Sequence, residues 1–199
     1  MPFQEDIMTL APGRYYWTRH DPEVKADLSS SAIEAEAGLF LIDPIPLPEN
    51  APFHADNVAG IVVTNGNHRR AAMELSRRFA APVFVHQALC SEPEFAGAIA
   101  TSGSATIDPE IEIIAIEGAA AGEIVLRHKC DGGGLIVGDA LINFEPHGFS
   151  FLPSKYCSNP RAMRRSLRGL LDHTFDWMLF AHGTPVLKGA RRRLESLFE

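Results

Sequence analysis

Residues 61–70 read Ile61-Val62-Val63-Thr64-Asn65-Gly66-Asn67-His68-Arg69-Arg70, an apolar run that ends in a polar turn. Residues 61–64 have the length and the β-branched content of a buried strand. From residue 68 to residue 79, Ala71, Leu75 and Phe79 recur at i, i+4 and i+8, which predicts an amphipathic helix. The stretch therefore predicts a strand that passes into a helix through a turn crowded with polar side chains.

Further elements follow on both sides of this stretch. A helix is predicted after Asn159-Pro160, where a capping side chain precedes a proline in the first turn, and another over residues 190–198. Three apolar runs between residues 111 and 137 have no helix between them, which favours a mixed or antiparallel sheet over a simple alternation of strand and helix. The strands predicted besides 61–64 are 38–42, 83–86, 111–116, 124–127, 135–137 and 177–180.

The composition is that of an ordinary globular protein. The 199 residues are 46% hydrophobic and 22% charged, with no repeat or linker-like stretch, so we expect a single domain over residues 1–199. A net charge of -7 makes nucleic acid or an anionic membrane surface an unsuitable partner. The three cysteines, Cys90, Cys130 and Cys157, are widely spaced, and we expect them to be reduced and inert in a cytoplasmic protein.

Five landmarks occur in order along the chain. A strand ends in Asp43, the 61–70 stretch follows, and then come 117–122 (Glu-Gly-Ala-Ala-Ala-Gly), Gly138-Asp139 and Ala181-His182-Gly183. In order, spacing and context they resemble the metallo-β-lactamase superfamily, which has a Thr-His-x-His-x-Asp-His turn, a Pro-Gly-His-Thr-x-Gly turn, a Gly-Asp strand end and a late Gly-His-Gly. The resemblance covers nearly the whole chain. It implies an α/β fold, a four-layer αββα sandwich with two mixed β-sheets.

The metal ligands that the resemblance implies are largely replaced. Asn65, Asn67 and Arg70 stand where the family has histidines, Arg69 stands at its aspartate, and Ala119 stands at the histidine of the third motif. Only Asp139 and His182 keep a metal ligand at a family position, and two ligands hold zinc poorly. We therefore expect no cofactor, and a metal-binding site that has been lost.

His68 occupies a slot that the family uses for a residue that binds no metal, so we expect a surface or helix-start histidine there. Asn67 is expected to cap the helix. Because a buried Asp139 needs a countercharge, we expect the guanidinium of Arg69 or Arg70 to pair with it. Two arginines and His68 at the start of a helix could also bind a small anion.

Two functions remain open. The first is a non-catalytic pseudoenzyme that binds a small anion in a vestigial pocket formed by Asn65, Asn67, His68, Arg69, Arg70, Asp139 and His182. The alternative is a metal-dependent hydrolase with a remodelled, mononuclear zinc site built from His68, Asp139, His182 and a further, unidentified residue. The sequence leaves the substrate open, and it is compatible with a homo-oligomer.

Overall fold

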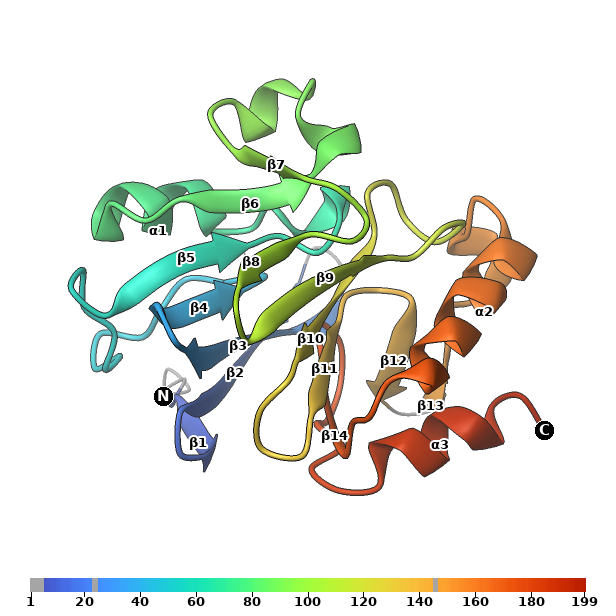
Figure 1. Cartoon of the computed structure of the whole chain (residues 1–199). Helices are drawn as coiled ribbons and strands as arrows, with labels where there is room; N and C mark the ends of the chain where they lie inside the picture. Colours follow the sequence, from blue (N-terminus) through green and yellow to red (C-terminus); the bar gives the residue numbers. More distant parts are fainter. Residues whose placement is uncertain (1–5, 23–24, 145–146) are drawn as a thin grey trace.

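Two β-sheets pack face to face, and helices cover the outer side of each sheet (Figure 1). The computed structural model describes residues 6–22, 25–144 and 147–199. The N-terminal part of the chain forms a seven-stranded sheet, and the C-terminal part forms a five-stranded sheet. This arrangement confirms the predicted αββα sandwich with two mixed sheets.

The first sheet has its strands in sequence order. Strands β1 to β4 pair antiparallel, whereas β4 to β7 pair parallel, so the carboxyl ends of β4 and β5 lie at the same edge. The predicted strands 38–42 and 83–86 are confirmed, but the one predicted at 61–64 begins earlier, at Val58. The strands are β1 (Met8–Ala11), β2 (Arg14–Asp21), β3 (Ala26–Ala35), β4 (Gly38–Ile42), β5 (Val58–Val62), β6 (Val83–His86) and β7 (Ile99–Thr101).

The second sheet has the order β14-β11-β10-β9-β8. All its pairs are antiparallel except β11 and β14, which run parallel although they lie far apart in the sequence. The hairpin β12–β13 stands beside this sheet. The strands are β8 (Thr106–Asp108), β9 (Ile111–Ala115), β10 (Ile124–His128), β11 (Gly134–Val137), β12 (Leu141–Phe144), β13 (Gly148–Phe151) and β14 (Trp177–Phe180).

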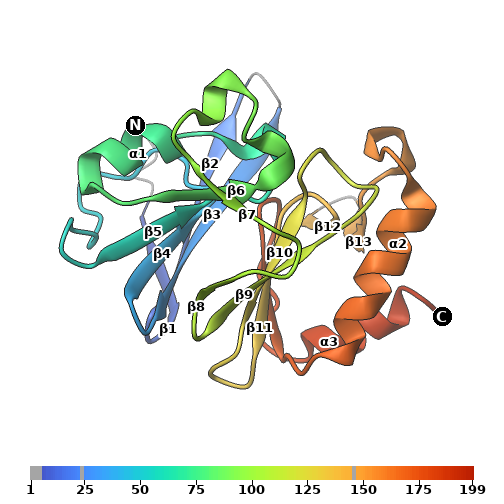
Figure 2. The same cartoon turned by 45° about the horizontal axis from the view of Figure 1, so that its top comes forward.

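In the described part of the chain, three α-helices form the outer layers (Figure 2). Helix α1 (Ala72–Phe79) packs on the first sheet, while α2 (Pro160–Gly169) and α3 (Ala190–Ser196) lie on the second sheet. Helix α2 begins as predicted, because the side chain of Asn159 accepts hydrogen bonds from the first free N–H groups. The helix predicted at 68–79 begins later than expected: residues Gly66–His68 form a 3₁₀ turn, η1, and α1 starts only at Ala72.

The alternation of side chains along the strands produces three apolar layers. In β4, Phe40 and Ile42 point into the space between the two sheets, where they belong to the same buried cluster as Leu126 of β10. Leu41 points the other way, towards α1 and its residue Leu75. A strand buried on both faces reads as a continuous apolar run, which is why this segment could be predicted from its sequence.

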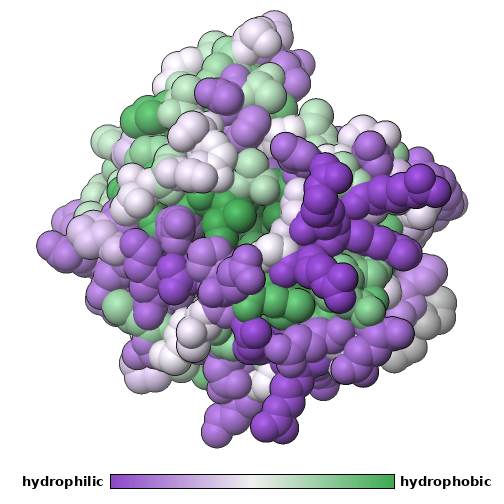
Figure 3. Space-filling model, turned by 45° about the vertical axis from the view of Figure 1, so that its right-hand side comes forward, coloured by the Kyte–Doolittle hydropathy of each residue, from purple (hydrophilic) through white to green (hydrophobic). Residues whose placement is uncertain are grey.

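The outer surface is predominantly polar on the side that carries the C-terminal helices. Figure 3 shows hydrophilic residues over most of this face, with smaller apolar areas between them. The helices in the described part of the chain are too short or too polar to span a bilayer.

Candidate functional site

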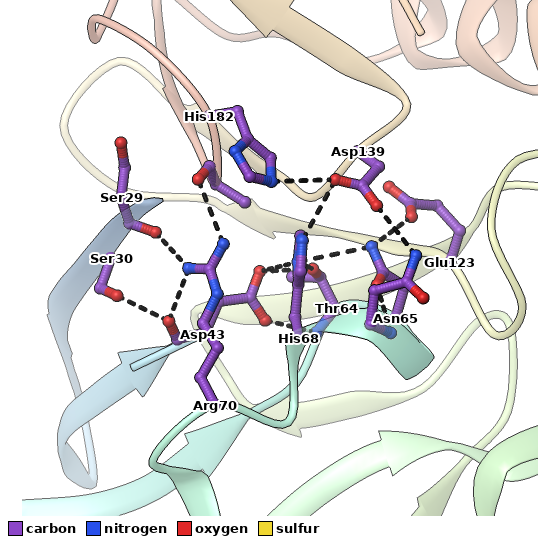
Figure 4. Close-up of polar contacts among 12 residues, drawn as sticks. Ser29, Ser30, Asp43, Thr64, Asn65, His68, Arg70, Glu123, Asp139 and His182 are labelled. Carbon is purple, nitrogen blue, oxygen red and sulfur yellow. Dashed lines mark hydrogen bonds and ion pairs between the residues drawn. The ribbon is translucent and has the colours of Figure 1, made fainter. Parts of the chain in front are cut away.

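A cluster of polar side chains lies at one edge of the sandwich, where strands of both sheets end (Figure 4). Asp43 follows β4 and Thr64 follows β5, while Asp139 follows β11 and His182 follows β14. Because β4 and β5 run parallel, and β11 and β14 also run parallel, each pair delivers its side chains to the same edge. The fold thus brings residues from distant parts of the sequence into one site.

The turn after β5 sets the direction of the following side chains. The side chain of Asn65 accepts a hydrogen bond from the backbone N–H of Asn67 at 2.9 Å and so caps the 3₁₀ turn. The prediction that Asn67 is the cap is therefore wrong. The side chain of Asn67 is exposed and instead reaches Asp139, with Nδ2 3.4 Å from Oδ2. Arg70 has φ of 39°, a left-handed conformation that separates this turn from α1.

His68 is buried at the centre of the cluster and is only 3% exposed. Its Nδ1 lies 2.9 Å from Oδ2 of Asp43, and its Nε2 lies 3.1 Å from Oδ1 of Asp139. The expectation of a surface or helix-start histidine is wrong, because His68 is the last residue of the 3₁₀ turn and its side chain is buried. Asp43 is held in turn by the backbone N–H of Thr64 at 2.7 Å and by the hydroxyl of the same residue.

His182 follows β14 and approaches Asp139 from the neighbouring strand of the same sheet. Its Nε2 lies 3.3 Å from Oδ1 of Asp139, and its Nδ1 lies 3.4 Å from the backbone carbonyl of Asp27. The two imidazole rings are 5.4 Å apart between centroids. Nε2 of each histidine therefore points to the same carboxylate oxygen, and one ligand atom from each of His68, Asp139 and His182 falls within 4.8 Å of the others.

The two arginines of the turn behave differently. Arg69 is exposed. The guanidinium of Arg70 is directed inward and donates to the backbone carbonyls of Ser29, Asp43 and Ala181, the latter two at 2.9 and 3.3 Å. The prediction that a guanidinium pairs with Asp139 is wrong. Among the described residues, the ion pairs of Asp139 are with His68 and His182. Arg70 instead joins β3 to the segments that follow β4 and β14 by these hydrogen bonds.

A buried glutamate completes the cluster. Glu123 accepts hydrogen bonds from Asn65 Nδ2 at 2.8 Å and from the backbone N–H of Ala140 at 3.0 Å. Sequence reasoning missed it, since a glutamate after a glycine carries no distinctive signal. Asp43 was also missed as a site residue, although its place at the end of an apolar strand was a usable signal. Ala119, the position at which the resemblance implied a histidine in the family, is buried and offers no ligand atom.

Burial and neighbouring charges shift several pKa values in the cluster. Burial lowers the pKa of His68, but the charges of Asp43 and Asp139 outweigh it and raise this pKa to about 9. Burial raises the pKa of Asp139, yet the two histidines bring it below its usual value. Burial, with the nearby charge of Asp139, raises the pKa of Glu123 to about 8. The cluster therefore combines ionised and neutral carboxyl groups within a small volume.

The cluster faces a cavity of about 710 Å³. One part of its wall is polar and the other is apolar, which suits a ligand with a polar group attached to a hydrophobic body. The polar wall consists of Asp21, Asn67, His68, Arg70, Asp139, His147 and His182, and the apolar wall includes Leu28, Ile142, Phe144, Leu152, Pro153 and Tyr156.

Comparison with known proteins identifies the family. The family model of the metallo-β-lactamase superfamily matches residues 8–199, nearly the whole chain. The chain belongs to the metallo-β-lactamase superfamily. In this chain Asn65, Asn67, Arg69 and Arg70 follow β5, and His68 is the imidazole that this stretch contributes to the site.

Solved metallo-β-lactamases have the same fold. The DIM-1 enzyme in a crystal exposed to ceftazidime superposes with a TM-score of 0.75 at 14% identity, covering 98% of this chain and 96% of the other. A metallo-β-lactamase from Pontibacter korlensis gives 0.72 at 15% identity, covering 98% of each chain. An archaeal superfamily protein from Sulfolobus tokodaii gives 0.66 at 15% identity, with 85% and 78% covered. No curated protein matches the sequence.

Proposed function

We propose that this protein is a metal-dependent hydrolase of the metallo-β-lactamase superfamily whose single ion is held by His68, Asp139 and His182. The observation that carries the proposal is the convergence of Nε2 of both histidines on one carboxylate oxygen of Asp139. Two imidazoles and one carboxylate form a ligand set that zinc accepts.

The separations between the ligand atoms fit a single ion. With zinc bonds of about 2.0–2.1 Å, neighbouring ligand atoms of a tetrahedral site lie roughly 3.3 Å apart. The two distances to Asp139 Oδ1 are 3.1 and 3.3 Å. Three protein ligands with one free position are typical of catalytic zinc sites, whereas structural sites are closed by four.

The surroundings of both histidines support the same assignment. A histidine that binds a metal generally donates its other ring N–H to a carboxylate or a backbone carbonyl, which fixes the tautomer. Nδ1 of His68 faces the carboxylate of Asp43, and Nδ1 of His182 faces the carbonyl of Asp27. Each imidazole is thereby held with Nε2 directed to the shared position.

Other residues of the cavity have roles of their own. An ion held there would polarise a carbonyl or phosphoryl oxygen of a substrate and lower the pKa of a water molecule. The exposed side chain of Asn67 stands beside Asp139 and can donate to a substrate oxygen. The apolar wall, with Ile142, Phe144 and Tyr156, would bury the hydrophobic part of the substrate and exclude water from it.

A second candidate is a metal-free protein that binds a small anion. It is favoured by the position of His68 between Asp43 and Asp139 at ion-pair distance from both, since an imidazolium there would take the place of the ion. In that case the inward guanidinium of Arg70 would supply positive charge to the cavity. The two candidates differ in one measurable property, the binding of a divalent ion.

Metal content is the decisive measurement. The purified protein is loaded with zinc, dialysed and analysed for zinc per chain, alongside His68→Ala, His182→Ala and His54→Ala. His54 is an exposed histidine in the loop before β5 and serves as the matched control. We expect the first two variants to lose one equivalent relative to the wild type, and the control to lose none. Equal zinc content in all four proteins contradicts the metal site and favours the anion-binding alternative.

Activity then tests the hydrolase assignment. The zinc-loaded wild type and His182→Ala are compared on a panel of lactam, ester, thioester and phosphodiester substrates. We expect hydrolysis of at least one class by the wild type and its loss in the variant. A wild type that holds the ion but hydrolyses none of them contradicts the hydrolase part of the proposal while leaving the metal site intact.

A further inference from the structure

A second cluster of metal-ligating side chains lies at the opposite end of β11 from Asp139. It consists of Glu110, His128 and Cys130, each of which places one ligand atom within 4.8 Å of the others. Sγ of Cys130 lies 2.9 Å from Oε1 of Glu110. Cys130 was expected to be reduced and inert, and its neighbour Glu110 carries no signal of this contact in the sequence.

The antiparallel pairing of β9 and β10 brings these residues together. His128 stands opposite Ile111, and the backbone N–H of Lys129 donates to the carbonyl of Glu110 at 2.9 Å. His128 and Cys130 are two residues apart, a spacing that places both side chains on one side of an extended chain. The cluster is thus set by the main chain of two adjacent turns, the β8–β9 turn and the β10–β11 turn.

His128 lacks the partners that a buried histidine needs. It is 4% exposed, and neither ring nitrogen forms a hydrogen bond with any described residue. Burial lowers the pKa of His128 and so favours its neutral form, although the carboxylate of Glu110 and the backbone of Glu34 partly oppose this shift. The ring of Trp177 packs against that of His128 at 5.7 Å between centroids. A buried polar group without a partner is costly, so a ligand for these nitrogens would remove an energetic penalty.

The charge around the cluster favours a cation. The cluster opens into a cavity of about 420 Å³. Carboxylates outnumber cations on its wall, which carries Glu34, Glu36, Glu110 and Asp131 against Arg14. The guanidinium of Arg14 is already engaged, since it lies 3.7 Å from the centre of the Trp177 ring and 3.7 Å from Oδ2 of Asp131.

We propose that Glu110, His128 and Cys130 form a second metal site, separate from His68, Asp139 and His182, for a thiophilic divalent ion, above all zinc. One thiolate, one imidazole and one carboxylate form a set that suits zinc. The thiol of Cys130 releases its proton to solvent when the ion binds, and the ion then joins the β8–β9 turn to the β10–β11 turn.

Cobalt(II) substitution tests this site separately from the first. A thiolate bound to cobalt gives a charge-transfer band in the near ultraviolet, and the site of His68, Asp139 and His182 contains no sulfur. The reduced full-length protein is titrated with cobalt, together with Cys130→Ser, His128→Gln and the exposed-cysteine control Cys90→Ser. Thermal melts of each variant establish that it is folded.

The expected pattern is a band of equal intensity in the wild type and in Cys90→Ser, and no band in Cys130→Ser. His128→Gln should need at least about tenfold more cobalt to reach half of the band, since even residues outside the coordination sphere weaken metal sites by that factor. A wild type without the band at millimolar cobalt overturns the proposal, as does a band that survives in Cys130→Ser or an unchanged titration of His128→Gln. His68→Ala should leave the band unaltered, so failure of one site is distinguished from failure of the other.

Discussion

Asp43→Asn should weaken metal binding at the site of His68, Asp139 and His182 without disturbing the fold. Asp43 is 1% exposed and has φ of 46°, a conformation that asparagine also tolerates. The amide keeps the shape of the carboxylate, and its oxygen can still accept from the N–H of Thr64. The change removes the negative acceptor that faces Nδ1 of His68 at 2.9 Å.

The magnitude follows from that single contact. A hydrogen bond to a charged group contributes about 1.5–3 kcal/mol, which corresponds to roughly a 10–150-fold change in an equilibrium constant. Carboxylates behind a metal-bound histidine typically change affinity by about 10–100-fold. We therefore expect the Kd for zinc to rise by about 10–100-fold in Asp43→Asn.

Competition with a chromophoric chelator measures this Kd, in a Cys130→Ser background so that the second cluster does not contribute. Asp56→Asn is the matched control, because Asp56 is exposed in the loop before β5, at the opposite end of that strand from Thr64. A Kd for Asp43→Asn within about twofold of the wild type would refute the role of the Asp43–His68 contact.

Three further predictions concern stability. Arg70→Ala removes charged donors from three backbone carbonyls and should lower the free energy of unfolding in urea by about 3 kcal/mol, whereas the exposed Arg69→Ala should change it by no more than about 0.5 kcal/mol. Gly134→Ala would place a Cβ 2.0 Å from the Trp177 ring and should lower the melting temperature sharply. Gly169→Ala, with open space around the added Cβ, should be neutral or stabilising. Equal melting temperatures of the two variants would contradict this packing. Glu123 has its pKa raised from 4.5 to about 8 in the fold, so its contribution to stability is full below pH 4.5 and is lost as the pH rises through 8. Glu123→Gln cannot ionise and should flatten the decline of stability between about pH 5 and 8 in urea titrations of the metal-free protein; an unchanged slope would exclude Glu123 as its source.

The parts of the fold that could be predicted from sequence are those whose burial follows a simple pattern. The strand at Gly38–Ile42 is buried on both sides and reads as an apolar run. Strand β3 was missed because Ser29, Ser30 and Ser31 occupy buried positions. Two of these hydroxyls have partners in the interior: that of Ser30 donates to the carbonyl of Asp43, and that of Ser29 accepts from the hydroxyl of Tyr16. Buried polar residues near the site therefore interrupt the apolar pattern by which a strand is predicted.

The site itself was predicted only in part. Asp139 and His182 lie together as the resemblance implied, and Asn65 and Asn67 contribute to the same turn. The inward direction of His68 depends on three residues of 3₁₀ geometry and on the left-handed backbone at Arg70, and neither is encoded in a periodic pattern. The helix begins at Ala72 and not at residue 68, and the intervening residues include the buried His68 and the inward guanidinium of Arg70, which a helical pattern does not predict.

The parallel pairing of β11 with β14 has a consequence for folding. His182 reaches Asp139 only after β14, the last strand, has joined the far edge of the second sheet. Contacts between such remote segments form late, because a long loop must close before they are made. During synthesis the pocket is therefore completed last, after β14 has left the ribosome. During refolding, ion binding should be detected later than the recovery of the helical circular dichroism signal.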